Sequence, residues 1–255
     1  MAKIIVGIVS HGHLGYIHSN LALVEIAQLD NVSVVIKDNI KDYRLKLYAD
    51  EVGYTYITTN DNMGFGENNN FIANFALENL EVSKGDWFII LNPDVEMSLF
   101  EFNKLIDQLK LQSGQFFAPN LFKDSEFKTT ENSIRKFASY LDLFNPFKLQ
   151  PINKPYDKND LTDLDVVEWA SGAFLCVTFA AFESVAGFDE KYFMYYEDVD
   201  LCYRLNQKGI KLRFLKNVKA VHKGEYKNRS IFSRHFRWYL NSLFKFLKMQ
   251  SHNGH

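Results

Sequence analysis

The 255-residue chain has only two cysteines, Cys176 and Cys202, which are too few for a disulfide framework or a zinc knuckle. Both lie in apolar sequence, as buried thiols in a reducing compartment do. The longest apolar run, residues 169–182, is interrupted by Ser171 and Thr178 and is too short to cross a bilayer. The N-terminus lacks the apolar core and cleavage site of a signal peptide, so we expect a cytoplasmic protein.

The chain has no large excess of charge of either sign, since its formal net charge at pH 7 is −2. General nucleic-acid binding usually needs a strong basic excess, and we therefore expect no nucleic-acid partner. Aromatic side chains are abundant instead, with 23 Phe and 13 Tyr. This composition indicates aromatic-lined clefts or an adhesive surface on an otherwise ordinary globular protein.

Short apolar runs alternate with segments of helical periodicity through the first half of the chain. The predicted strands are residues 4–9, 32–36, 54–58, 87–91 and 115–118, and the predicted helices are 17–29, 41–52, 70–80 and 99–111. Strands of about five residues separated by helices of about a dozen predict an α/β fold with a mainly parallel central sheet and flanking helices. Ligands bind such sheets at the carboxyl ends of the strands.

We expect one large domain over residues 1–230, in which residues 121–165 form an irregular insertion or lid. Beyond it we predict strand sequence from Val166, a helix over residues 198–208, and two strands, 211–215 and 218–221. The remaining residues, 231–255, form a basic amphipathic helix and tail. Such a helix either lies on an anionic membrane surface or docks on the domain, and periodicity does not separate these alternatives.

Two acidic segments point to chemistry. Residues 187–204 hold five acidic residues among Phe and Tyr, where a carboxylate is costly to bury unless it takes a proton or faces a cation. Asn92-Pro93-Asp94 follows the predicted strand 87–91. Together the two segments suggest an enzyme with a metal-bound anionic leaving group and a carboxylate base.

Seven motifs in this order give the chain a resemblance to a known family. They are Ile8–His11, Asp38-Asn39, Asn62–Asn70, Leu91–Val95, Ser171–Ala173, Gly187–Glu190 with Tyr195–Arg204, and His222. In this order and spacing the chain resembles the inverting family-2 glycosyltransferases with a GT-A fold, within their rhamnosyltransferase-like bacterial branch. The resemblance covers residues 4 to 245.

The resemblance implies a nucleotide-sugar site at the strand ends. The residues assigned to it are Ser10, His11, Asp38, Asn62, Gly64, Asn92, Asp94 and Arg204. Asp38 would accept a hydrogen bond from the imide N–H of a uracil or thymine ring, or would only form an Asx turn with Asn39. Residues 62–70 either approach the ligand or form a capped helix entry. Arg204 would reach the diphosphate or pair with Asp200 at i, i+4.

The resemblance further implies a metal site. Asp94, with His222, would bind Mg²⁺ or Mn²⁺, which are hard cations suited to carboxylate and diphosphate oxygens. Asn92 stands where much of the fold class has a first aspartate, so one ligand charge is missing. The alternatives are an Asn-Pro turn and a structural histidine.

Catalysis is assigned to Glu197 and Asp198. Asp198 would be the base that takes the proton of the acceptor hydroxyl, while Glu197 orients the acceptor. The alternative is that both carboxylates only favour a helix N-terminus. Acceptor binding is assigned to Trp169, Gly172 and Ala173, for which ordinary core strand is the alternative.

We therefore expect a metal-dependent inverting glycosyltransferase that moves rhamnose from dTDP-rhamnose to a cell-surface polysaccharide or lipid-linked glycan. UDP-galactofuranose, UDP-glucose and UDP-N-acetylhexosamine stay open as donors. A nucleotidyltransferase would need cations in the loop after the first strand, which residues 10–13 do not supply. A non-catalytic carbohydrate-binding protein of the same fold is a further alternative. The C-terminal helix could place the enzyme on the inner face of the cytoplasmic membrane.

Overall fold

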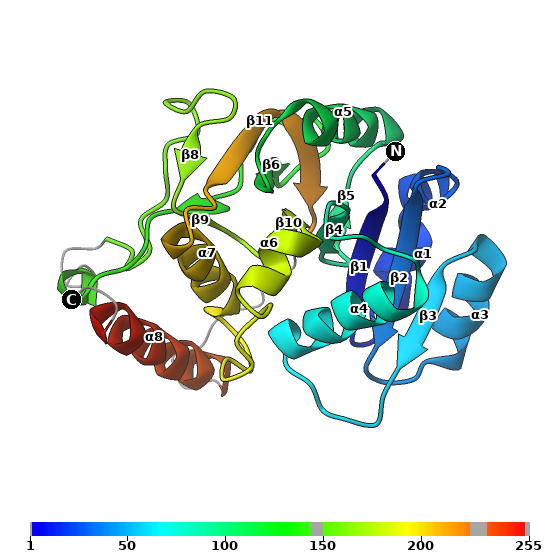
Figure 1. Cartoon of the computed structure of the whole chain (residues 1–255), viewed down its shortest axis with the longest axis horizontal. Helices are drawn as coiled ribbons and strands as arrows, with labels where there is room; N and C mark the ends of the chain where they lie inside the picture. The colour runs from blue at the N-terminus through cyan, green and yellow to red at the C-terminus, as the bar shows by residue number, and fades with distance from the viewer. Residues whose placement is uncertain (1, 144–149, 225–233, 253–255) are drawn as a thin grey trace.

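The computed structural model describes residues 2–143, 150–224 and 234–252. The strands are β1 (Ile4–Ser10), β2 (Val32–Asp38), β3 (Thr55–Thr58), β4 (Trp87–Leu91), β5 (Val95–Glu96), β6 (Phe116–Phe122), β7 (Ile134–Arg135), β8 (Val166–Val167), β9 (Trp169–Ala170), β10 (Phe174–Thr178) and β11 (Leu212–His222). The helices are α1 (Leu14–Ser19), α2 (Leu21–Ala27), α3 (Tyr43–Val52), α4 (Phe65–Asn79), α5 (Leu99–Leu111), α6 (Phe179–Ser184), α7 (Glu197–Gln207) and α8 (Arg234–His252). The predicted α/β class is confirmed (Figure 1).

A central sheet organises the domain, with strand order β3-β2-β1-β4-β10-β6-β11-β5 and β8 paired with β11. Alternate residues of β1 serve two cores on opposite faces of this sheet. Ile4, Val6 and Ile8 pack with α1, α2, α3 and α5, while Ile5 packs on the other face with α4. Because both faces are covered, the central strands are apolar almost throughout, which is why they were readable in the sequence.

The first four strands of the sheet are parallel, and their carboxyl ends meet at one edge. Ser10 pairs in register with Asp38, and Asp38 pairs with Thr58. The other half of the sheet is mixed, because β10 runs antiparallel to both β4 and β6 while β11 is parallel to β6. The two-residue strand β5 pairs with the end of β11, so that Val95 lies opposite His222.

Several element boundaries differ from those predicted, each for a local reason. The predicted helix 17–29 is two helices, because Asn20 ends α1 and its side chain accepts a hydrogen bond from the Leu23 N–H to cap α2. The two strands predicted at 211–215 and 218–221 are one strand, β11, with an irregularity between Leu215 and Lys219. Helix α4 starts at Phe65, earlier than predicted.

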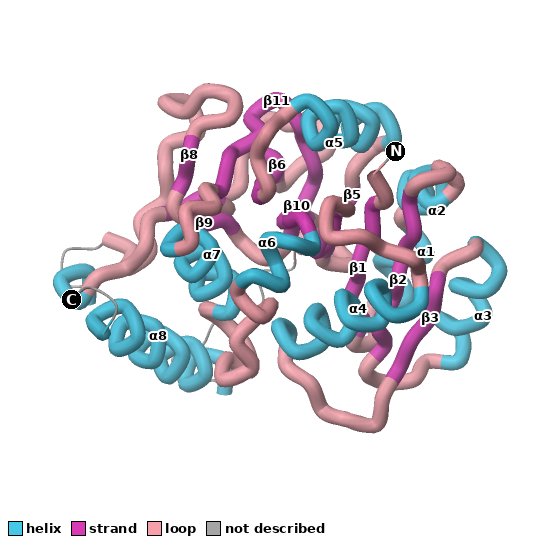
Figure 2. Tube along the Cα trace, viewed as in Figure 1, coloured by secondary structure: helices cyan, strands magenta, loops and turns pink. Residues whose placement is uncertain are grey.

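The predicted insertion, residues 121–165, is largely loop in the part that the structure describes (Figure 2). It is nevertheless tied to the domain: β7 pairs with β9, and the Lys158 ammonium donates to Asn120, Ser133 and the Leu121 carbonyl. Residues 144–149 of the insertion lie outside the described residues.

The C-terminal helix α8 docks on the domain, which confirms one of the two alternatives left open by its periodicity. Leu243, Phe246 and Leu247 are fully buried. Phe246 lies against Tyr203 of α7 at a ring-centroid separation of 5.6 Å, and Figure 1 shows α8 next to α7. Residues 225–233 and 253–255, which fall partly within the predicted tail, lie outside the described residues.

Candidate active site

A cavity of about 670 Å³ opens between the end of β11, the start of α7 and the insertion. It gathers seven of the residues assigned from the sequence: Asn92, Trp169, Gly172, Ala173, Glu197, Asp198 and His222. Other residues that line it are Phe65, Glu131, Arg135, Asn153, Tyr195, Tyr196 and Tyr239. Segments that are distant in the sequence therefore meet around one space large enough for a sugar ring and part of a second ligand.

Asp94 and His222 form a pair at the edge of this cavity. The turn Asn92–Val95 is closed by a backbone hydrogen bond, and pairing of β5 with β11 brings Asp94 next to His222. Nε2 of His222 lies 3.4 Å from Oδ1 of Asp94, and Nδ1 lies 2.9 Å from Oε2 of Glu131. Burial alone would lower the pKa of His222, but its two carboxylate partners raise it to about 9. Burial alone would raise the pKa of Asp94. The hydrogen bond and charge of His222 lower this pKa, and the net shift is downward.

These residues fit a divalent cation that is also bound by the phosphates of a nucleotide-sugar donor. Within the described part of the chain, no group of three or more His, Cys, Asp or Glu side chains is arranged to hold a metal ion. Mg²⁺ is commonly bound by one or two carboxylates together with substrate phosphates, so a small protein ligand set is what such a site requires. Glu131 takes Nδ1 of His222, which leaves Nε2 beside Asp94, in the arrangement of a metal-ligating histidine oriented by a carboxylate.

Asp198 and Glu197 begin helix α7 and face the cavity. Oδ2 of Asp198 accepts a hydrogen bond from the Gly172 N–H at 2.9 Å, and Oδ1 accepts one from its neighbour Val199. A Cβ on Gly172 would lie 3.3 Å from Cβ of Asp198, so glycine allows this close approach. Burial raises the pKa of Asp198, against the effect of these backbone donors. An elevated pKa suits a carboxylate that must take a proton.

Glu197 has a different environment from its neighbour. Its side chain is buried, and its Oε2 has no hydrogen-bond partner in the structure. Burial and the adjacent charge of Asp198 raise the pKa of Glu197 well above its ordinary value. Two adjacent carboxyl groups with raised pKa values favour a state in which the pair holds a proton.

Replacing Glu197 by Gln is expected to stabilise the protein near pH 8 more than near pH 5. The folded-state pKa of Glu197 lies above its unfolded value, so unfolding releases a proton and the stability of the parent falls as pH rises between the two. A neutral amide does not titrate, so the advantage of the variant grows across that window. Thermal unfolding of both proteins at the two pH values checks this. An equal difference at both would contradict it.

Two consecutive tyrosines lead into this helix with left-handed backbones. Tyr195 has φ 68° and Tyr196 has φ 69°. For bulky residues without glycine's freedom this conformation is rare and costs on the order of 1–3 kcal/mol each. The surroundings must therefore hold this peptide in place, and it sets the direction in which Glu197 and Asp198 leave the loop.

The predicted nucleotide-binding residues Ser10, His11 and Asp38 lie together at the ends of β1 and β2, outside the cavity lining. Asp38 is fully buried. Its carboxylate accepts hydrogen bonds from the backbone N–H groups of Ile40 and Asp42, and from the Tyr56 hydroxyl. The Asx turn is thus present, and it fixes the carboxylate at the strand edge. Ser10 is buried, whereas His11 is exposed.

Asn62 and Gly64 lie in the loop before α4. Asn62 is exposed and does not line the cavity. A Cβ on Gly64 would lie 2.4 Å from the Phe193 carbonyl oxygen, and the Phe65 N–H donates to that same oxygen. Glycine is therefore required here for contact with the acidic aromatic segment, and not only for approach to a ligand.

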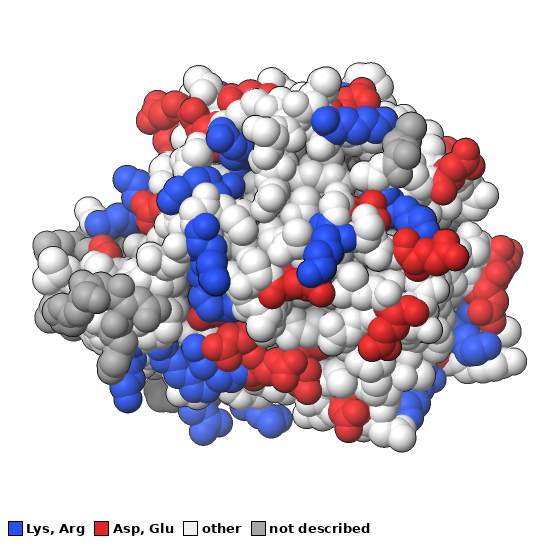
Figure 3. All heavy atoms as spheres, in the orientation of Figure 1, with Lys and Arg blue, Asp and Glu red and all other residues white. Residues whose placement is uncertain are grey.

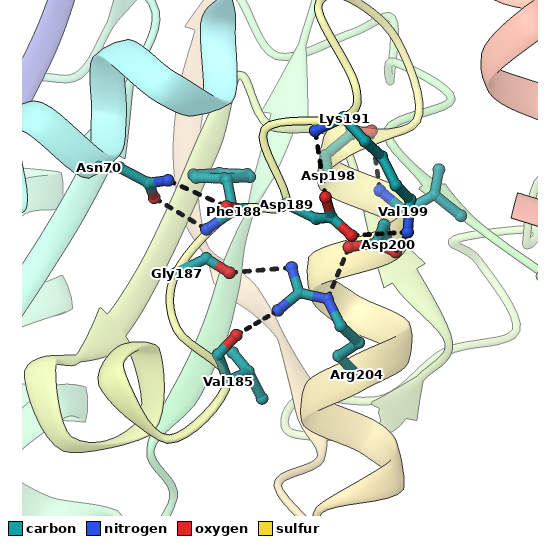
Figure 4. Close-up of polar contacts among 10 residues, drawn as sticks. All are labelled: Asn70, Val185, Gly187, Phe188, Asp189, Lys191, Asp198, Val199, Asp200 and Arg204. Atoms are coloured by element: carbon teal, nitrogen blue, oxygen red, sulfur yellow. Dashed lines mark hydrogen bonds and ion pairs between the residues drawn. The ribbon is translucent and has the colours of Figure 1, made fainter. Parts of the chain in front are cut away.

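Arg204 pairs with Asp200, as the i, i+4 alternative predicted. Its Nε donates to Asp200 at 2.6 Å, and its other nitrogens donate to the carbonyls of Val185 and Gly187 (Figure 4). It does not line the cavity. The guanidinium ties the loop before residue 190 to α7 near Asp198, and we leave Arg204 out of the proposed donor site.

Three further residues at the site were not identified from the sequence. Glu131 and Arg135 come from the insertion, whose lack of periodicity gave no signal. Arg135 lies 5.9 Å from the ring centroid of Trp169, and its charge favours ionised Asp198. His13 interacts electrostatically with both Asp94 and Asp38, although burial is the main cause of its lowered pKa. The Ser-His-Gly-His order was the available signal for His13.

Comparisons with known proteins agree with this geometry. No family model matches the chain. Over 241 residues the chain is 34% identical to rhamnosyltransferase WbbL of Escherichia coli strain K12, an alignment that covers 94% of this chain and 90% of that protein. It is 31% identical over 144 residues to N-acetylglucosaminyl-diphospho-decaprenol L-rhamnosyltransferase of Mycobacterium tuberculosis, covering 54% of this chain and 47% of that one.

Solved structures share the fold at low sequence identity. GalNAc-T7, crystallised with UDP, GalNAc and Mn²⁺, aligns with a TM-score of 0.66 and 13% identity over 96% of this chain and 48% of its own. The mannosyltransferase PcManGT of Pyrobaculum calidifontis, in complex with GDP-Man and Mn²⁺, aligns with a TM-score of 0.59 and 11% identity over 97% and 64%. With a relative at 34% identity over nearly its whole length, this chain belongs to the rhamnosyltransferases among the family-2 glycosyltransferases, with the GT-A fold.

Proposed function

We propose that the protein transfers rhamnose, with inversion at the anomeric carbon, from dTDP-rhamnose to a hydroxyl of a cell-surface or lipid-linked glycan. The observation that carries the proposal is the single cavity lined by both Asp198 and His222, with Asp94 in contact with His222. Asp198, the candidate base, and the candidate metal site at Asp94 and His222 thus adjoin the same cavity. The two rhamnosyltransferase relatives support rhamnose over the UDP-hexose, UDP-N-acetylhexosamine and UDP-galactofuranose alternatives.

Inversion needs one carboxylate base and no covalent sugar–enzyme intermediate. Asp198 takes the proton of the acceptor hydroxyl as that oxygen bonds to the anomeric carbon, and the bond from this carbon to the diphosphate oxygen breaks. The Gly172 N–H holds the carboxylate in place. Holding donor and acceptor in line supplies much of the remaining rate enhancement.

Asp94 and His222 would hold Mg²⁺ or Mn²⁺, which supplies Lewis-acid stabilisation of the negative charge on the departing diphosphate. Ser10 and Asp38, at the adjoining strand ends, would bind the nucleotide base. His13 interacts electrostatically with both Asp38 and Asp94. Trp169 is a buried residue of the cavity lining, with Arg135 over its ring at 5.9 Å from the centroid and its Nε1–H donating to the Lys136 carbonyl. This ring is suited to stacking on the C–H face of a sugar.

A thermal-shift panel of nucleotide sugars with and without Mn²⁺ tests the donor. A ligand that binds only the native state raises the melting temperature by mass action. At a ligand concentration of 100 times Kd, the free energy of unfolding rises by about 2.7 kcal/mol. We expect dTDP-rhamnose with Mn²⁺ to give the largest shift. A larger shift with any UDP-sugar would overturn the choice of donor, and equal shifts without the metal would overturn metal dependence.

Glu131 is expected to set the metal affinity through His222. Replacing Glu131 by Ala removes the partner of Nδ1, and loss of such an outer partner typically lowers metal affinity by about 10- to 100-fold. Glu131→Gln keeps a neutral acceptor for the ring N–H and should lose less. Titration calorimetry with Mn²⁺ and dTDP measures both variants. An unchanged affinity in Glu131→Ala would show that Glu131 does not act on the metal site.

We also propose that the outer face of α8 binds an anionic membrane. The helix contains no acidic residue. Arg234, Arg237 and Lys248 are exposed, together with Phe244 at 54% exposure, and Figure 3 shows Lys and Arg gathered over the region of α8. Cations around an apolar side chain are typical of a helix at a lipid surface. Among the described residues, no helix is both long and apolar enough to span a membrane.

Vesicle binding tests the membrane proposal. Because the inner face of α8 is buried in the domain, substitutions on the outer face are more specific than removal of the helix. Arg237→Gln with Lys248→Gln should weaken sedimentation with anionic vesicles, since each cation near such a surface contributes about 1 kcal/mol. Lys46→Gln with Lys110→Gln, on exposed positions of α3 and α5, is the matched control. Equal binding by all proteins would reject a role for α8.

A further inference from the structure

We propose that α8 is a working part of the active site, in which Tyr239 is a positioning residue that holds the loop leading into Glu197 and Asp198 and completes the acceptor side of the cavity. The description of the cavity's acceptor side rests on the proposed function, whereas the role of Tyr239 in holding the loop does not. The sequence predicts that residues 231–255 form a helix and tail separate from the domain. The contacts of α8 join it to the domain instead.

Rings of α8 clamp the two left-handed tyrosines. The Tyr239 ring centroid lies 6.2 Å from that of Tyr195 and 5.6 Å from that of Tyr196. Phe246, two turns further along the helix, lies 5.5 Å from Tyr196. The Tyr196 hydroxyl also donates to Oδ1 of Asn153 in the insertion. Tyr196 is therefore fixed between α8 and the insertion, directly before the catalytic helix.

Polar contacts from α8 fix the backbone of the same loop. Oγ of Ser242 donates to the Met194 carbonyl at 3.2 Å, and Nζ of Lys245 donates to the Lys191 carbonyl at 2.7 Å. The Tyr195 hydroxyl lies 3.1 Å from Nδ1 of His235. One face of α8 thus contacts four residues of this loop, which are Lys191, Met194, Tyr195 and Tyr196. A helix that only packed on the domain as a separate appendage would not need so many contacts to one loop.

The backbone conformation explains why the loop needs this support. Tyr195 and Tyr196 both have positive φ values, which bulky residues rarely adopt unless their surroundings impose them. If the clamp is lost, this peptide can relax, and the first turn of α7 carries Asp198 with it. A displacement of about 1 Å at a reacting group is enough to cost on the order of 10²-fold in rate.

Tyr239 also lines the cavity itself, as do Tyr195, Tyr196 and Ile152. These residues lie on the insertion and α8 side, away from Ser10 and Asp38 at the strand ends. A change at Tyr239 should therefore affect acceptor binding and the rate of transfer, while binding of dTDP-rhamnose stays as it is. This separation distinguishes a positioning role from general loss of folding.

The test compares Tyr239→Ala with Tyr239→Phe and with Asn241→Ala, a change at an exposed position of the same helix that does not line the cavity. We expect Tyr239→Ala to lower kcat by about 10- to 100-fold and raise the acceptor KM, with the Kd for dTDP-rhamnose unchanged. Tyr239→Phe, which keeps the ring, should retain most activity, and Asn241→Ala should match the parent. A kcat and acceptor KM within twofold of the parent in Tyr239→Ala would overturn the proposal.

Hydrogen exchange gives a readout that does not depend on the donor. Amide exchange across residues 191–200 should rise in Tyr239→Ala and stay at the parent level in Tyr239→Phe and Asn241→Ala. Unchanged exchange in Tyr239→Ala overturns the clamp, whatever sugar the enzyme uses. If Tyr239→Ala does not fold, His235→Ala serves as a second variant. His235 is exposed, so its replacement removes another contact to Tyr195 without leaving a cavity. It should raise exchange at the same residues, and no rise would also overturn the clamp.

Discussion

Asp198→Asn is expected to lower kcat by about 10²- to 10⁴-fold, the contribution typical of a positioned general base. The amide has nearly the same shape, and its oxygen can still accept the Gly172 N–H, but its NH2 group cannot accept the Val199 N–H that bonds to Oδ1 in the parent. The variant also loses the ability to take the proton of the acceptor hydroxyl, and this second loss accounts for the expected fall in kcat. Transfer to a defined glycan acceptor, measured with saturating dTDP-rhamnose and Mn²⁺, gives the effect on kcat.

Donor binding provides the control for this variant. The Kd for dTDP-rhamnose should change by no more than about twofold, because the donor site at Ser10 and Asp38 lies apart from Asp198. Glu190→Gln, from the same acidic segment but exposed and outside the cavity, should transfer at the parent rate. Transfer by Asp198→Asn at the rate of the parent would show that another group is the base. Absence of transfer by the parent, despite binding, would favour the non-catalytic alternative.

The assignment of the base to Asp198 and not to Glu197 rests on their surroundings. Asp198 has two backbone N–H partners that stabilise its ionised form, whereas Oε2 of Glu197 has none in the structure. A base must be ionised before the reaction, so the supported carboxylate is the better candidate. We propose that Glu197 holds a proton and offers a hydrogen bond to the acceptor.

Most of the fold could be predicted from the sequence because its central strands are buried on both faces. The runs at 4–9, 32–36 and 87–91 are apolar except for Ser33, and their positions are confirmed. The direction of β10 was not predictable, because antiparallel pairing with β4 follows from the tertiary path of the chain. The break at Asn20 was missed because a capping side chain inside an apolar pattern does not disturb its periodicity.

The site was predictable where residues sit at strand and helix ends, and not where tertiary packing decides. Asp198 and His222 follow from their places in motifs, and the cavity brings them together. Glu131 comes from an irregular segment that has no pattern to interpret. Arg204 had two chemically reasonable partners in the sequence, and only the fold shows that it pairs with Asp200. The same applies to Tyr239, whose periodicity indicates a buried face but not what that face holds.

Asp94→Asn is expected to lower both Mn²⁺ affinity and transfer, each by about 10²-fold or more, because it removes the carboxylate charge beside Nε2 of His222. Asn92 already stands where much of the fold class has a second carboxylate, so no neighbouring acid in this turn replaces the lost charge. The amide can still accept a hydrogen bond from His222, and the fold should be retained.

Metal binding in this variant is measured apart from activity, by the loss of free-Mn²⁺ electron paramagnetic resonance signal on addition of protein with dTDP. Asp107→Asn, an exposed position on α5, is the matched control and should bind as the parent does. Full Mn²⁺ affinity in Asp94→Asn would exclude Asp94 as a ligand. Normal transfer despite lost Mn²⁺ binding would mean that the charge on the departing diphosphate is stabilised by protein groups alone, with Lys123, Arg135 and His222 of the cavity lining as candidates.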